Sequence, residues 1–179
     1  MNTIKHTANN AIYLSTPLGQ VMIEANEQGL TQVAFVEDVE REDERPSNAL
    51  VLEAKRQLQA YFDGELTSFD LPLAPKGTEF RTKVWAALQQ IPYGETACYG
   101  DIANALNNPK AVRAVGGANG ANPISIIVPC HRIIGKDGSL TGYASGVDKK
   151  EWLLALERED EPEISYEELL ENLKQHGKI

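Results

Sequence analysis

The spacing of the apolar residues changes along this chain, and that change constrains its fold more than any other feature. Apolar and polar residues alternate over 11–16, 21–25 and 31–36, with turn-forming residues between the runs; this predicts three antiparallel strands. From Val51 to Phe62 the apolar residues recur at helical spacing, until Gly64 ends the pattern. A helix capped by Ser47 is therefore expected to cover the sheet. Residues 1–75 thus predict an N-terminal domain, and the combination of a sheet with helices predicts the α/β (α+β) fold class for the chain.

Residues 76–158 show a mainly helical pattern and predict a second domain. Pro72 to Gly77 serves as the linker, and a helix is expected from Thr78 to about Ile91. Two short helices follow, at 99–106 and from Pro109 to about Gly117, with a turn at 107–108 between them. Such a pair resembles a helix-turn-helix, although helix pairs are common and the pattern alone is weak evidence for DNA binding.

The remaining segments predict a buried strand and two helices. The continuous β-branched run Ile124 to Val128 favours a buried strand that ends at Pro129. Asp148 and Glu151 resemble a capping box at the start of the next helix. Residues 159–179 form an acidic amphipathic tail, which could pack on its own domain or bind a partner.

Composition excludes several classes of protein. The chain has 179 residues and two cysteines without CxxC spacing, and its histidines are scattered, so we expect neither a disulfide framework nor a metal site. No uncharged apolar run approaches the roughly 20 residues that span a bilayer, and no secretory signal is visible, so a cytoplasmic location is expected.

The net charge of −9 is unevenly distributed. Residues 1–75 carry 5 basic and 12 acidic groups, residues 76–150 carry 9 and 5, and residues 151–179 carry 3 and 9. Because the local field determines which surface meets a polyanion, DNA remains a candidate partner of the positive middle third.

Cys130 is the residue best suited to nucleophilic chemistry. A free cysteine is most often a small buried hydrophobe, and Cys98 keeps that interpretation. Cys130 differs because His131 and Arg132 adjoin it and could favour the thiolate, which is the reactive form. In an extended strand, however, neighbouring side chains point to opposite faces, so His131 could reach the sulfur only through a backbone turn or a bridging water. Glu157 is a candidate to orient the imidazole.

An ordered set of motifs resembles the O6-alkylguanine-DNA alkyltransferases, also called methylated-DNA protein-cysteine methyltransferases. The set covers most of residues 78–157, while residues 1–75 are similar to the variable N-terminal domain of that family. The motifs, in chain order, are Ile91-Pro92-Tyr93-Gly94-Glu95-Thr96, Tyr99-Gly100, Ala111-Val112-Arg113-Ala114-Val115-Gly116, Asn122-Pro123 with Pro129-Cys130-His131-Arg132, Thr141-Gly142-Tyr143 and Lys150-Glu151-Trp152-Leu153-Leu154.

The resemblance implies both a fold and an activity. The fold would combine an RNase H-like N-terminal domain with a C-terminal winged helix-turn-helix domain. The activity would be direct, irreversible transfer of an alkyl group from guanine O6, and from thymine O4 in some cases, to a cysteine. Each molecule would act once, as a monomer on double-stranded DNA, without a cofactor and without a metal.

The resemblance also assigns roles to residues. Cys130 would be the acceptor, His131 a water-mediated base, Glu157 its partner and Asn122 a brace for the turn. Two more residues would act on DNA: Tyr99 would rotate the damaged base outward, and Arg113 would fill the gap that it leaves. From the residues alone, Tyr99 could instead be a core aromatic residue and Arg113 a surface ion-pair partner. The substrate pocket would be lined by Tyr143, Ala144 and Ile133. Ala144-Ser145-Gly146 stands where the family commonly has consecutive glycines, which leaves the preferred alkyl size open.

Two other functions fit parts of the pattern. A binding module could recognise alkylated DNA without chemistry, but related non-transferring proteins replace the acceptor cysteine, which this chain retains. A hydrolase with a cysteine-histidine pair would turn over repeatedly, but it needs nucleophile and base in direct reach, which adjacent positions supply poorly.

Overall fold

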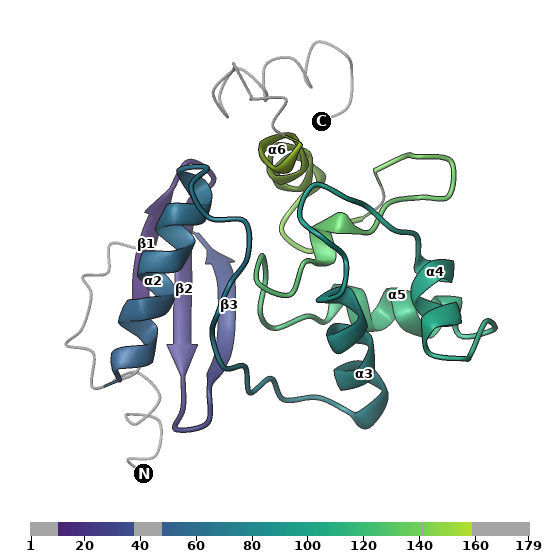
Figure 1. The fold of residues 1–179 in the computed structure, drawn as a ribbon, viewed down its shortest axis with the longest axis horizontal. Coiled ribbons are helices and arrows are strands. Elements are labelled where there is room, and N and C mark those ends of the chain that lie inside the picture. The colour runs from purple at the N-terminus through teal and green to yellow at the C-terminus, as the bar shows by residue number, and fades with distance from the viewer. Residues whose placement is uncertain (1–10, 38–47, 141, 159–179) are drawn as a thin grey trace. The chain divides into compact units, whose positions relative to one another are not determined.

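The computed structural model describes residues 11–37, 48–140 and 142–158 (Figure 1). The chain divides into two compact units, and the first combines residues up to Lys76 with the short segment Pro123–Ile127. The second contains Gly77–Asn122 and the chain from Val128 onward. The predicted domains were continuous in sequence and placed Pro123–Ile127 in the second domain, whereas in the structure this segment belongs to the first unit.

The first unit is built on a three-stranded antiparallel sheet in the order β1-β2-β3, as the alternating pattern predicted. The strands are β1 Ala11–Thr16, β2 Gly19–Ala25 and β3 Leu30–Val36. Asn26 shapes the turn between β2 and β3, because its side-chain oxygen accepts hydrogen bonds from the backbone of Gln28 and Gly29 at 2.8 and 3.1 Å. Alternate residues of β2 are buried, which explains the period of two in the sequence.

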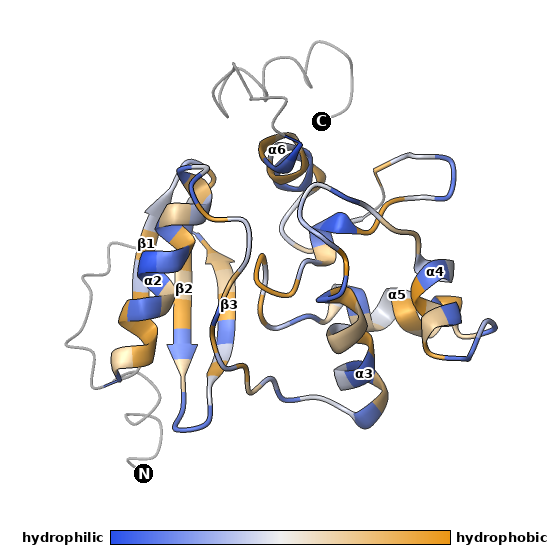
Figure 2. Ribbon diagram, in the orientation of Figure 1, coloured by the Kyte–Doolittle hydropathy of each residue, from blue (hydrophilic) through white to orange (hydrophobic). Residues whose placement is uncertain are grey.

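Helix α2, Ala49–Phe62, packs on β1 and β2 and covers one face of the sheet (Figure 1). Val51, Ala54 and Leu58 are fully buried on the face that packs on the sheet, whereas Leu52 is exposed. Polar residues occupy the rest of the helix, so α2 carries both colours in Figure 2. The N-cap is Asn48, whose side chain accepts from Leu50 N at 2.8 Å; the predicted cap, Ser47, lies outside the described residues.

The predicted strand Ile124–Val128 is wrong in its geometry but right in its burial. Only Ile124 pairs, as an isolated parallel bridge to Val33 of β3, and the residues after it form turns. Ile126 has a φ of 73°, which no strand contains. Both Ile124 and Ile126 are nevertheless fully buried, so the apolar run marks a segment of the hydrophobic core rather than a strand.

The second unit begins with three packed helices: α3 Glu79–Leu88, α4 Tyr99–Ala105 and α5 Val112–Gly120. Trp85 of α3 anchors the group, since its indole nitrogen donates to the carbonyl of Ala118 at 2.8 Å. The helix α5 starts at Val112, later than predicted, and Pro109 lies in the preceding turn rather than at the first helical position.

The unit is completed by a short 3₁₀ helix, η1 Cys130–Arg132, and by α6 Val147–Glu157, which packs against it. Ala97 pairs with Ile133 through two backbone hydrogen bonds of 2.9 Å, so the start of α4 and the end of η1 are tied together. The cap of α6 is Gly146, not the predicted Asp148. The predicted helix in the 159–179 tail lies outside the described residues.

Candidate active site

Two consecutive tight turns lead the chain into Cys130. Ile127 N donates to Ser125 O at 2.8 Å, and Cys130 N donates to Val128 O at 2.8 Å, so each bond closes a three-residue γ-turn. The 3₁₀ helix η1 then begins at Cys130. The backbone therefore turns at the nucleophile, which removes the alternation of faces that an extended strand would have imposed on Cys130 and His131.

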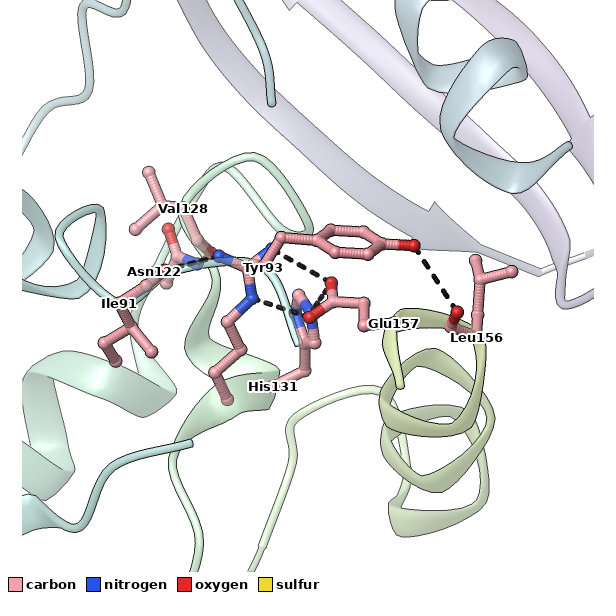
Figure 3. Close-up of polar contacts among 8 residues, drawn as sticks. Ile91, Tyr93, Asn122, Val128, His131, Leu156 and Glu157 are labelled. Atoms are coloured by element: carbon pink, nitrogen blue, oxygen red, sulfur yellow. Dashed lines mark hydrogen bonds and ion pairs between the residues drawn. The ribbon is translucent and has the colours of Figure 1, made fainter. Parts of the chain in front are cut away.

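Asn122 holds this turn from the opposite side. Its side-chain amide donates to the Val128 carbonyl at 2.8 Å and to the Cys130 sulfur at 3.2 Å (Figure 3 draws the first of these). One amide thus fixes both the backbone before the cysteine and the cysteine itself. A donor directed at sulfur stabilises the thiolate relative to the thiol.

Burial nevertheless opposes ionisation of Cys130. Its side chain is buried, and burial raises the pKa of the Cys130 thiol above its ordinary value of 9.0. Hydrogen bonding from Asn122, the charge of Lys150 and a hydrogen bond from Tyr143 act in the opposite direction and offset part of that rise. Desolvation outweighs these neighbours, so the buried sulfur favours its protonated form until a base removes the proton.

His131, Glu157 and Arg132 form a buried network next to the cysteine. The Nε2 atom of His131 lies 2.7 Å from Oε2 of Glu157, and Figure 3 shows this carboxylate at the end of α6 directed at the imidazole. Arg132 donates to both oxygens of Glu157, from Nε at 2.7 Å and from Nη2 at 3.1 Å. Its third contact, from Nη1 to the carbonyl of Ile91 at 2.6 Å, fixes the guanidinium.

The charges in this network determine which nitrogen of His131 is basic. Burial alone would raise the pKa of Glu157, but the contacts with His131 and Arg132 outweigh it and hold the pKa at about 2. Burial outweighs the opposing effect of the Glu157 carboxylate and lowers the pKa of His131 below its ordinary value of 6.5, which favours the neutral imidazole. A neutral imidazole that faces a carboxylate through Nε2 carries its proton there, which leaves the lone pair on Nδ1. Within the part of the chain that the structure describes, Nδ1 is buried and has no hydrogen-bond partner.

Lys150 is a functional candidate that the sequence interpretation missed. It is fully buried, and its charge acts on Cys130. Burial lowers the pKa of Lys150 to about 8, and the charge of Cys130 opposes this shift. Lys150 and Glu157 lie seven residues apart on α6, which is two helical turns, so one face of the helix carries a cation for the cysteine and an anion for the histidine. Nothing in the sequence separates Lys150 from a surface lysine, since lysines are almost always exposed.

The structure links five of the predicted site residues by direct interactions. Cys130, Asn122, His131, Glu157 and Tyr143 interact with one another in pairs. Of the remaining predicted residues, Ile133 is fully buried after η1, Ala144 is exposed next to Tyr143, Tyr99 is half-buried at the start of α4, and Arg113 is exposed on α5.

The described residues lack the features of two other kinds of site. No helix among them is long and apolar enough to cross a membrane. They also contain no group of three or more His, Cys, Asp or Glu side chains that could hold a metal ion.

Comparison with known proteins covers both units. A family model for the 6-O-methylguanine DNA methyltransferase DNA-binding domain matches residues 79–159, and one for the ribonuclease-like domain of the same proteins matches residues 11–75. A methylated-DNA–protein-cysteine methyltransferase of Methanosarcina acetivorans is 56% identical over 146 residues, which cover 79% of this chain and 94% of the relative. The constitutive enzyme of that name from Bacillus subtilis is 49% identical over 162 residues, or 86% and 94% of the two chains.

Solved structures agree with the sequence comparisons. The crystal structure of Mycobacterium tuberculosis OGT in complex with DNA superposes with a TM-score of 0.77 at 45% identity, and the match covers 88% of this chain and 97% of that one. This similarity, together with the three-stranded sheet and the helices described above, confirms the predicted α/β fold with a ribonuclease-like and a DNA-binding domain. The chain therefore belongs to the 6-O-methylguanine DNA methyltransferase family, as the order of its motifs predicted.

Proposed function

We propose that this protein repairs O6-alkylguanine in duplex DNA by transferring the alkyl group irreversibly to Cys130. The observation that carries the proposal is the arrangement around that sulfur. Asn122 donates to it at 3.2 Å, and the adjacent imidazole is held by a carboxylate at 2.7 Å with Nδ1 left as the basic nitrogen. Membership of the family supplies the substrate class, and the geometry supplies the acceptor.

His131 acts in this proposal as the base that activates the thiol. The thiol proton passes to Nδ1 through a bridging water, and Glu157 stabilises the imidazolium that results. Arg132 keeps Glu157 ionised and in place through two hydrogen bonds. The thiolate forms next to the Asn122 amide and the charge of Lys150, which lower its pKa. Both groups therefore stabilise the anion at the moment of reaction.

The transfer itself is a displacement at carbon. The Cys130 sulfur forms a bond to the alkyl carbon while the bond from that carbon to guanine O6 breaks, and the bonding pair leaves with the guanine. Protonation then yields unmodified guanine, and the protein keeps a stable thioether. Since nothing in this sequence regenerates the thiol, each molecule acts once. Tyr143, Ala144 and Ile133 are proposed to line the pocket that receives the base.

DNA is the proposed partner of α4 and α5. A base in a duplex cannot reach a buried thiol unless it is rotated out of the stack. Tyr99 at the start of α4 is proposed to drive that rotation, and Arg113, exposed on α5, to fill the space. The neighbouring positions on α5 are Val112 and Ala114, which are small enough to allow close approach to a groove. We further propose that the protein acts as a monomer in the cytoplasm.

Mapping of the adduct tests this function. The full-length protein is incubated with a duplex that contains O6-methylguanine and is then digested with trypsin. One methyl group is expected on the peptide Ala114 to Arg132, which contains Cys130 and no other cysteine. The peptide Val84 to Lys110, which contains Cys98, is the internal control and is expected to stay unmodified.

The same experiment separates the alternatives. More than one product molecule per protein molecule would indicate a hydrolase. Tight binding of the duplex without any methylated peptide, unchanged in Cys130→Ala, would indicate a binding module. The Cys98→Ser variant is expected to transfer as well as the native chain.

A further inference from the structure

Ile126 adopts a backbone conformation that a β-branched residue rarely tolerates. Among the described residues other than glycine, only Asn107 and Ile126 have positive φ, at 57° and 73°. Asparagine accepts this region readily, because its short polar side chain bonds locally. For isoleucine it is a true outlier, since the branched Cβ approaches the following carbonyl. The conformation at Ile126 is therefore strained, whereas that at Asn107 is not.

The strained residue lies in a turn that directly precedes the segment leading to Cys130. The hydrogen bond from Ile127 N to Ser125 O, 2.8 Å, makes Ile126 the centre of the rare kind of γ-turn with positive φ. The second γ-turn, centred on Pro129, follows directly and ends at Cys130 N. Only three residues lie between Ile126 and Cys130, so a change of φ at Ile126 would move Cys130.

Contacts on both sides hold the strained residue in place. Before it, Val33 donates to the carbonyl of Pro123 at 2.9 Å and accepts from Ser125 N at 2.8 Å, which fixes the segment to β3. After it, the Asn122 amide bonds the carbonyl of Val128. The side chain of Ile126 is itself 1% exposed, so packing also restricts its movement. A strained residue persists only where its surroundings determine it in this way, and such residues concentrate at functional sites.

We infer that Ile126 is a positioning residue for alkyl transfer, which uses its buried side chain to hold the γ-turn that places the Cys130 sulfur on the Asn122 amide. The inference rests on the proposed function. It adds to that function a residue that touches neither substrate nor reacting atoms.

Two matched pairs of variants separate backbone strain from packing. Ile126→Gly and Ile126→Ala both remove the anchor, but glycine adopts positive φ without strain and alanine does not. Ile124→Gly and Ile124→Ala remove an equally buried isoleucine two residues earlier, at a position without positive φ. At position 126 the glycine variant is expected to melt about 2–4 °C above the alanine variant, whereas at position 124 alanine should give the higher Tm.

The rate of transfer tests the positioning role. Single-turnover transfer from free O6-benzylguanine is measured at saturating substrate, well below every Tm, so that all variants are folded. Ile126→Ala is expected to react roughly tenfold more slowly than Ile126→Gly, because its backbone relaxes and displaces the sulfur, while the half-saturating concentration stays the same. If Ile126 only packs, the two folded variants react at equal rates, and that outcome overturns the inference.

The wild-type protein provides an independent check if the variants do not fold. Positive φ brings the amide and α protons of one residue close together, so a strong intraresidue contact between them is expected at Ile126 by NMR, and its absence would also overturn the inference. A wild-type protein that transfers no alkyl group would instead refute the proposed function, and the order of the melting temperatures would remain interpretable.

Discussion

Lys150 is a buried charge that lowers stability and, in the proposed reaction, favours the thiolate of Cys130. Its pKa of about 8 lies below the ordinary value of 10.5 because burial disfavours the charged form. The unfolded chain therefore binds a proton that the folded chain has lost between about pH 8 and 10.5, so this group makes the free energy of unfolding rise with pH over that range. At neutral pH the protein retains a destabilising cation whose field acts on Cys130.

Lys150→Met is expected to slow alkyl transfer without lowering stability. Methionine keeps much of the apolar stem but removes the charge that stabilises the thiolate, so the maximal rate at pH 7 should fall by roughly 10–100-fold. The rise of the rate with pH should also move to higher pH, because the pKa of Cys130 increases. Single-turnover rates from pH 6 to 10 and denaturant unfolding at pH 7 measure both effects.

The neighbouring lysine supplies the control for this variant. Lys149→Met removes the same charge from a half-buried position on the same helix and is expected to leave the pH profile of transfer unchanged. Equal profiles for Lys150→Met and the native protein would show that the cation has no part in forming the thiolate.

Glu157 makes the opposite contribution, because it stabilises the fold. Its pKa of about 2 lies below the ordinary 4.5, so its stabilisation is fully present above about pH 4.5 and is lost as the pH falls toward 2. A shift of this size corresponds to about 3 kcal/mol. Glu157→Gln should lower the free energy of unfolding at pH 7 by about 3–5 kcal/mol, since Arg132 is left buried without its counter-charge.

Denaturant unfolding at several pH values tests this prediction. The gap in unfolding free energy between the native protein and Glu157→Gln is expected to narrow as the pH falls from 4.5 to 2. The control, Glu151→Gln, removes a carboxylate from the same helix and should lie close to the native protein throughout. A gap that is independent of pH would mean that the Glu157 charge does not stabilise the fold.

At the scale of elements, α5 is proposed to contact DNA, and Arg113 tests that role. Arg113 is exposed on this helix, so Arg113→Ala should leave the fold and the reaction with free O6-benzylguanine unchanged. Repair of a methylated duplex should slow by about tenfold or more, because the space left by the rotated base is no longer filled. Comparison of the two single-turnover rates measures the effect.

The matched control for Arg113 is Arg81→Ala, an exposed arginine on α3 whose loss changes the net charge equally. It should affect duplex repair little. If both variants lose the same activity on the duplex, the contribution of Arg113 is general electrostatic attraction rather than insertion.

Elements differed in how well their sequence predicted them. The strands β1 to β3 alternate apolar and polar residues because one face of the sheet is buried under α2. This alternation is a local sequence pattern, so the strands could be predicted from it. The segment Ile124 to Val128 is buried on all sides, and an apolar run then reports burial without specifying backbone geometry. The positive φ of Ile126 contradicts its intrinsic preference, so no rule of propensity could have predicted the turn.

At the scale of the whole molecule, the distribution of charge along the sequence does not coincide with the two compact units of the fold. The net charge is −9, yet residues 76–150 are positive, and this is the region that contains α4, α5 and Cys130, the proposed acceptor. The first unit in turn receives Pro123–Ile127, the segment that precedes the nucleophile. A division of the chain by sequence alone would assign that segment to the second domain, because the contact with β3 is made by residues about 90 positions apart, which a local pattern cannot reveal.

The sequence by itself determined the family, the sheet and the order of the helices, and it singled out Cys130 as the candidate acceptor, because these depend on local periodicity and on the order of motifs along the chain. Cys130, Asn122, His131 and Glu157 could all be named before their contacts were known. Only the tertiary structure decided that Glu157 meets His131, that Lys150 is buried with its charge acting on Cys130, and that Ile126 is held in a strained turn. Burial and charge pairing arise when distant segments pack together, and it is this packing that sets the pKa of each group at the site.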